Sequence, residues 1–146
     1  MTGGDGAAGN PRLSARSVED LAVLAALLQD AIVPLGDMAY IAGDRTFVLA
    51  LNRFRWEAGE GAATRERIHA GLRFDAVQRV RYRGIRRADR RQFLSLLTIS
   101  YDDGVVVLHF AGGGMIRLDV DELRCALEDF GEPWPTPSTP SHEATG

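Results

Sequence analysis

The feature of this sequence that most limits its fold is the alternation of apolar and polar residues between residues 38 and 118. From Ala70 to Tyr82 nearly every even position is apolar, whereas the odd positions carry charged residues such as Arg73 and Arg79. Successive side chains of a strand point to opposite faces, so this period of two predicts strands with one buried face and one face in water. Because such half-buried strands are typical of antiparallel sheets, we expect a mostly antiparallel sheet.

Turn residues divide this region into about seven strands. Gly43 and Asp44 predict one hairpin turn, and the run from Asp102 to Gly104 predicts another. The segment 70–82 is long for one strand, so we expect a bend or bulge near Asp75. The expected strands are 38–41, 46–56, the two halves of 70–82, 94–101, 105–110 and 115–118.

Two segments carry a helical pattern instead. Ser17 and Asp20 resemble a capping box, and apolar residues then recur at helical spacing, which predicts a helix over about residues 18–30. Asp119 can cap a second helix, which Gly131 and Pro133 would end. The apolar stripe of this closing helix would be Val120, Leu123, Leu127 and Phe130.

An amino-terminal helix, about seven strands and a carboxyl-terminal capping helix define an α+β fold with a bent sheet or roll. The order is similar to that of the pleckstrin-homology type of roll, in which a carboxyl-terminal helix plugs a bent sheet. The 146 residues suit one domain. We expect residues 17–132 to form it, with a disordered tail at 1–16 and a Pro-rich disordered tail at 133–146.

The sequence favours a cytoplasmic protein. The longest apolar run, from Leu21 to Leu28, is far shorter than the roughly 20 residues that a membrane helix needs, so no membrane partner is expected. The amino terminus lacks the basic and apolar segments of a secretory signal. Cys125 is the one cysteine and cannot form an internal disulfide, which fits a reducing compartment.

No group of residues has the spacing of a catalytic or metal site. On the expected closing helix Cys125 has acidic neighbours, which disfavour a thiolate. His69, His109 and His142 are scattered, and none has a second ligand at metal-binding spacing. We therefore predict no catalytic residue, metal or cofactor, and the sequence favours a binding module over an enzyme.

The distribution of charge is the strongest functional signal. All 17 basic residues are Arg, and residues 45–91 hold 13 of them against 5 acidic residues, a local charge of +8. The rest of the chain has a charge of −11, so the total of −3 hides a polarised molecule. The predicted partner-binding residues are Arg53, Arg55, Arg79, Arg81, Arg83, Arg86 and Arg87.

Such a basic surface suits an anionic partner, because the planar guanidinium binds both oxygens of a carboxylate or phosphate. The favoured partner is an acidic protein surface, either on another protein or on a second copy of this chain. Nucleic acid is the alternative, although no ribonucleoprotein motif is present. A solvated strand face without a partner remains the plain structural interpretation.

Several strings resemble a known family. Leu51 to Glu57 reads L-N-R-F-R-W-E and Gly112 to Val120 reads G-G-G-M-I-R-L-D-V; with 28–33, 36–40 and 127–131 they look similar to an alphaproteobacterial family catalogued as domain of unknown function 2948. The likeness covers most of residues 17–134 and implies a bacterial cytosolic protein. Genes of that family often lie near those for histidinol dehydrogenase and an early peptidoglycan enzyme. A small enzyme or accessory subunit of amino-acid or cell-wall precursor metabolism is therefore the second alternative.

Overall fold

The computed structural model describes residues 12–55 and 65–136. These residues form ten strands, one α-helix and three short 3-10 turns. The first half comprises β1 (Arg12–Ala15), α2 (Val18–Leu27), β2 (Ile32–Pro34), β3 (Met38–Ile41), β4 (Thr46–Phe54) and β5 (Arg65–Phe74). The second half comprises β6 (Val77–Arg83), β7 (Phe93–Asp102), β8 (Val105–Phe110), β9 (Met115–Val120) and β10 (Cys125–Thr136).

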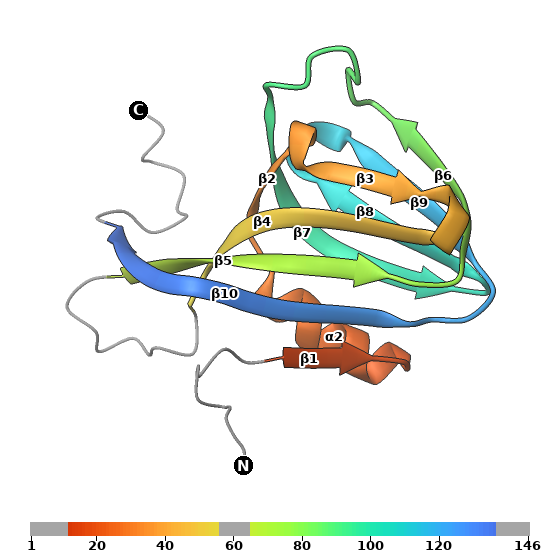
Figure 1. Ribbon diagram of the computed structural model, residues 1–146, viewed down its shortest axis with the longest axis horizontal. Coiled ribbons are helices and arrows are strands. Elements are labelled where there is room, and N and C mark those ends of the chain that lie inside the picture. The colour runs from red at the N-terminus through yellow and green to blue at the C-terminus, as the bar shows by residue number, and fades with distance from the viewer. Residues whose placement is uncertain (1–11, 56–64, 137–146) are drawn as a thin grey trace.

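All ten strands belong to one antiparallel sheet, which is strongly curved (Figure 1). Its order is β1-β10-β5-β4-β2-β7-β8-β9-β6, and β3 pairs with residues 46–49 of β4 on the side opposite β5. The curvature gives two layers, one of β1, β10, β5 and β4 and the other of β7, β8, β9 and β6. Strand β2 joins the layers, because Ile32 is paired with Asn52 of β4 on one side and with Ser95 of β7 on the other.

A corner between β5 and β6 carries the chain from one layer to the other. Ala76 has a left-handed backbone with φ of 57°, and the N–H of Val77 donates to the carbonyl of Arg45 at 2.8 Å. The long alternating run therefore breaks where the sequence predicted a bend, beside Asp75.

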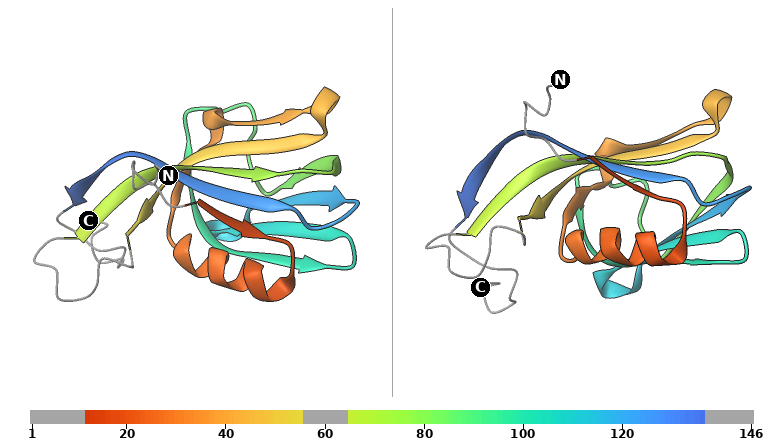
Figure 2. Two further views of the ribbon diagram at one scale, coloured as in Figure 1. Left: turned by 60° about the horizontal axis from the view of Figure 1, so that its bottom comes forward. Right: turned by 90° about the horizontal axis from the view of Figure 1, so that it is seen from below.

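The core lies between the two layers and is closed on one side by α2. This helix contacts β1 and β7 and lies along the open side of the curved sheet (Figure 2). The Ser17 hydroxyl accepts a hydrogen bond from the Asp20 N–H at 3.1 Å, which confirms the predicted amino-terminal cap. The helix buries Leu21, Leu24 and Ala25. It is not a membrane helix: nothing in the described part of the chain is both helical and long and apolar enough to cross a bilayer.

The predicted carboxyl-terminal helix is wrong. Residues 125–136 form β10, which pairs with β1 on one side and β5 on the other. Cys125, Leu127 and Asp129 of β10 are all buried, as the period of two of a strand requires. The helical interpretation arose because Leu123 and Leu127 fit both periods, and because the buried Asp129 concealed the alternation. Phe130, expected in the core, is 45% exposed.

The predicted α+β class and the pleckstrin-homology comparison are wrong as well, because the described residues form a mostly antiparallel β structure with one helix. The predicted strand count of seven missed β1, β2 and β10, which are short or flanked by polar and Pro residues. Strands β1 and β10 also place residues 12–15 and 133–136 in the sheet, although both segments were expected in tails. The rest of those tails lies outside the described residues.

Candidate functional site: the arginine face

The outer surface of the β6–β9–β8 layer carries the candidate site, which we call the arginine face. Antiparallel register places its side chains in rows that run across the three strands. These rows are Arg79–Asp119–Val105, Arg81–Arg117–Val107 and Arg83–Met115–His109. The face therefore has a basic edge on β6, the charged Arg117 and Asp119 on β9, and an aliphatic part formed by Met115, Val107 and Val105.

One carboxylate lies among four arginines of this face. Asp119 accepts from Arg117 Nε at 3.1 Å and from Arg79 Nε and Arg81 Nη2 at 3.3 Å each. Arg83 has no ion-pair partner in the portion of the chain that the structure describes. The face thus keeps a net local charge of +3.

The charge state of Asp119 follows from these neighbours. Burial alone would raise the pKa of its carboxyl, but the hydrogen bond and charge of Arg117, together with the charge of Arg81 and the hydrogen bond of Arg79, lower that pKa below its ordinary value. Asp119 therefore stays ionised at physiological pH and partly neutralises the three arginines around it.

The centre of the face is hollowed. A depression of about 360 Å³ lies over β9 and is lined by three arginines and three apolar or aromatic residues. Its lining residues are Arg81, Tyr82, Arg83, Val107, Met115 and Arg117. Arg87 does not line this depression: its guanidinium carbon lies 4.2 Å from the centre of the Tyr82 ring, which packs against the core on the other face of β6.

The structure brings some predicted site residues together and separates others. Arg79, Arg81 and Arg83 share the basic edge, whereas Arg87 lies against the Tyr82 ring on the other face of β6. Arg86 lies exposed in the loop after β6, where its carbonyl accepts from Gln92 Nε2 at 2.7 Å.

Arg53 and Arg55 lie on β4 and just after it, in the other layer. Arg53 is 1% exposed and is paired with Asp129 at 2.7 Å, so its predicted place on the exposed basic surface is wrong. Arg55 forms an ion pair with Glu66. The alternation of Arg53 with Phe54 suggested an exposed arginine, but both side chains are buried.

Sequence reasoning missed Arg117, Asp119 and Met115. Arg117 lies in the part of the chain with net negative charge, and Asp119 was assigned to a helix cap. The signal that identifies them is the register of the paired strands: once β6 and β9 are paired, Arg117 lies opposite Arg81 and Asp119 lies opposite Arg79. Strand alternation places side chains on a face, but only pairing shows which neighbours they meet.

The residues considered for catalysis are separated from this face or from each other. Cys125 is buried, and desolvation, followed by the charge of Asp75, raises the pKa of its thiol to about 12, so it remains protonated. His109 lies on the outer face of β8, with Nε2 at 3.1 Å from the Ser100 hydroxyl. No cluster of three metal-ligating side chains occurs in residues 12–55 and 65–136. His142 lies outside the described residues.

Comparison with known proteins gives one match. A family model described as a protein of unknown function (DUF2948) covers residues 12–142. Neither the search of curated proteins nor that of solved structures found a match.

Proposed function

This chain belongs to the protein family of unknown function DUF2948, and we propose that it is a non-catalytic binding module whose arginine face docks an acidic segment of a partner protein. The observation that supports this most is the charge imbalance of that face. Three arginines share the single carboxylate of Asp119, and Arg83 adds a fourth positive charge to the face. The proposed setting is the cytoplasm of a bacterium, where a single unpaired cysteine is ordinary.

The spacing of the basic edge suits an extended partner. Arg79, Arg81 and Arg83 alternate along β6, so neighbouring guanidinium groups leave the backbone about 6.5–7 Å apart. Alternate side chains of an extended peptide have the same repeat, which allows acidic residues at every second position to pair with successive arginines. Each arginine can bind a carboxylate with two parallel hydrogen bonds.

The centre of the face favours protein over nucleic acid. Sheets that bind single-stranded RNA stack its bases on exposed aromatic rings. Here the hollow is lined by Val107 and Met115, and the one aromatic residue that lines it, Tyr82, packs its ring against the core on the other face of β6. Aliphatic side chains of a peptide fit such a surface better than bases do.

The proposal predicts binding of an alternating peptide such as (Glu-Leu)6 to the full chain. We expect saturable binding by fluorescence anisotropy, reduced at least about tenfold in Arg81→Glu/Arg83→Glu because charge-assisted hydrogen bonds are lost. The control is Arg90→Glu/Arg91→Glu, which makes the same change in net charge in the loop after β6. Circular dichroism checks that all variants remain folded.

Other results would identify other functions. Tighter binding of single-stranded RNA, with an affinity that falls about 10³-fold or more between about 50 and about 200 mM salt, would replace the protein partner by nucleic acid. A mass that rises with concentration in the wild type but not in the charge-reversed variant would identify a second copy as the partner. Turnover of a small molecule would favour the enzyme alternative. Equal peptide binding by all variants would leave the arginine face as a solvated surface.

A further inference from the structure

The other layer presents a second, separate outer face. Register again places side chains of β1, β10, β5 and β4 in rows. Two neighbouring rows are Arg12–Glu128–Gly71–Ala50 and Ser14–Ala126–Arg73–Val48. Each row has one small residue in its middle, Gly71 or Ala126, beside one charged residue, Glu128 or Arg73, and the face is hollowed over β5 and β10 at the small residues.

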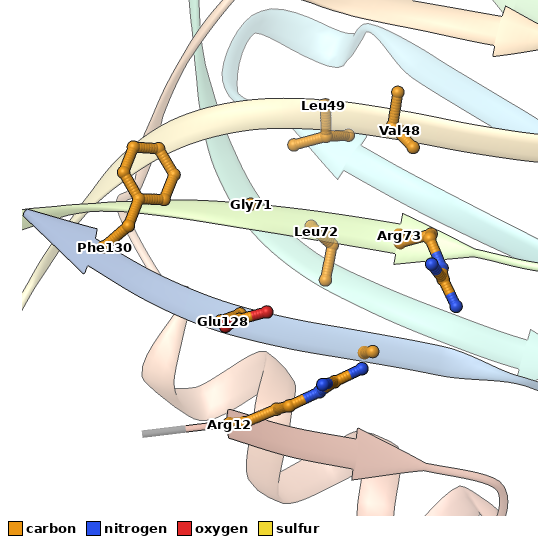
Figure 3. Close-up of a pocket in the computed structure, with 9 residues that line it drawn as sticks. Arg12, Val48, Leu49, Gly71, Leu72, Arg73, Glu128 and Phe130 are labelled. Carbon is orange, nitrogen blue, oxygen red and sulfur yellow. The ribbon is translucent and has the colours of Figure 1, made fainter. Parts of the chain in front are cut away.

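Two depressions on this face form one groove. The first, of about 390 Å³, has Gly71 on its floor and Phe130 and Val48 on its walls. The second, of about 290 Å³, shares Arg12, Arg73 and Ala126 with the first and adds further arginines. Figure 3 shows Phe130 at one end of the first depression, Arg12 and Arg73 at the other, and Gly71 between them.

The apolar half of the groove has space beside an aromatic ring. Phe130 is 45% exposed, and its ring is stacked on His69 with 5.9 Å between centroids. A Cβ atom built on Gly71 would lie 4.0 Å from Phe130 Cε2, with nothing else within that distance. A planar apolar group can therefore lie over Gly71 against the Phe130 ring, the offset contact that aromatic pairs favour.

The basic half carries unpaired positive charge. Its lining includes four arginines and one carboxylate, that of Asp75. Arg73 is paired with Asp75 at 3.2 Å, and Arg124 with Glu122 at 3.5 Å. The guanidinium groups of Arg12 and Arg16 have no ion-pair partner among the residues described. Both arginines line this depression and neither guanidinium is held in an ion pair there within the described part of the chain, so both forks are available to a phosphate, whose three oxygens can accept from both.

We propose that this groove binds a small phosphate ester that carries a planar ring, the chemistry of a nucleoside monophosphate. The ring lies over Gly71 against Phe130, and the phosphate binds Arg12 and Arg16. A site of a few hundred Å³ with an apolar half and a few converging polar groups is typical of small-molecule sites. This site shares no residue with the arginine face and does not depend on the proposed function.

In the test, the full chain is titrated with AMP, adenosine and ribose 5-phosphate. Binding is measured by calorimetry and by the change in NMR chemical shift of the Gly71 amide. We expect AMP to bind at least about tenfold more tightly than either fragment, because it alone fills both halves. Gly71→Leu should weaken AMP binding about tenfold or more while leaving ribose 5-phosphate unaffected, since it blocks only the ring half. Arg12→Gln/Arg16→Gln should weaken the binding of AMP and of ribose 5-phosphate about tenfold or more.

Gly71 lies outside the left-handed region, so Gly71→Leu introduces no backbone strain, and thermal unfolding checks that this variant is folded. Arg12→Gln/Arg16→Gln changes only exposed side chains and tests the site independently of Gly71. Arg81→Glu/Arg83→Glu is the matched control and should bind AMP as the wild type does. This control makes failure of the groove proposal distinguishable from failure of the proposed function of the arginine face. Absence of saturable AMP binding, or equal binding by all variants, would overturn the site. A concentration-dependent mass that Gly71→Leu abolishes would show that a second copy occupies the groove and would overturn it too.

Discussion

Arg53 and Asp129 form a bidentate ion pair inside the sheet, with Nε–Oδ1 at 2.9 Å and Nη2–Oδ2 at 2.7 Å. Arg53 Nη1 also donates to the Phe54 carbonyl at 3.0 Å. Both side chains are almost fully buried, so the Asp129 carboxylate depends on Arg53 for compensation. Such a pair adds little net stability compared with apolar residues, yet it makes the loss of one partner costly.

We expect Arg53→Met to lower the free energy of unfolding by about 3–5 kcal/mol, because it leaves the Asp129 carboxylate buried and uncompensated. Urea denaturation measures the loss. Arg53→Met/Asp129→Leu should recover most of it, since the double variant removes both charges. If the double variant is no more stable than the single one, the loss comes from packing of the Arg53 side chain and not from the unpaired charge.

At the scale of the elements, the β5–β6 corner shows what the sequence could predict. Its position followed from a run too long for one strand, and α2 and the β7–β8 hairpin followed from a cap and a turn signal. These signals are local. The assignment of 119–130 failed because its stripe fitted the helical period as well as the strand period, and only pairing with β1 and β5 decides between them. The arginine face was predicted along β6, but its β9 half required the register.

The corner also supplies a prediction about the chain itself. Ala76 holds φ of 57°, a left-handed conformation that costs a non-glycine residue about 1–2 kcal/mol. Ala76→Gly removes this strain but adds conformational freedom to the unfolded chain, so we expect a net stabilisation of about 0.5–1 kcal/mol in urea denaturation. Ala39→Gly in β3, an exposed strand position outside the left-handed region, is the control and should destabilise by about 0.5–1 kcal/mol. A loss in both variants would mean that the corner is not strained.

The whole molecule combines a net charge of −3 with an arginine face of local charge +3. These two charges make opposite predictions for an acidic peptide. If the net charge governed association, added salt would screen repulsion and strengthen binding. If the local face governs it, added salt weakens binding. The Debye length is about 10 Å at 0.1 M salt, shorter than the protein, so distant acidic residues are screened and the local face should decide.

We therefore expect the affinity for the alternating Glu-Leu peptide to fall steadily as salt rises from about 50 to about 200 mM, at pH 7 and thus above the sequence pI of 5.6. Asp119→Asn should bind more tightly and depend more steeply on salt, because it releases three arginines from their shared carboxylate. Arg81→Glu/Arg83→Glu should lose the dependence or reverse it, since its face is no longer basic. Fluorescence anisotropy at four salt concentrations measures all three slopes. A wild-type affinity that rises with salt would show that the net charge governs the encounter, and the arginine face would then have no role in attracting its partner.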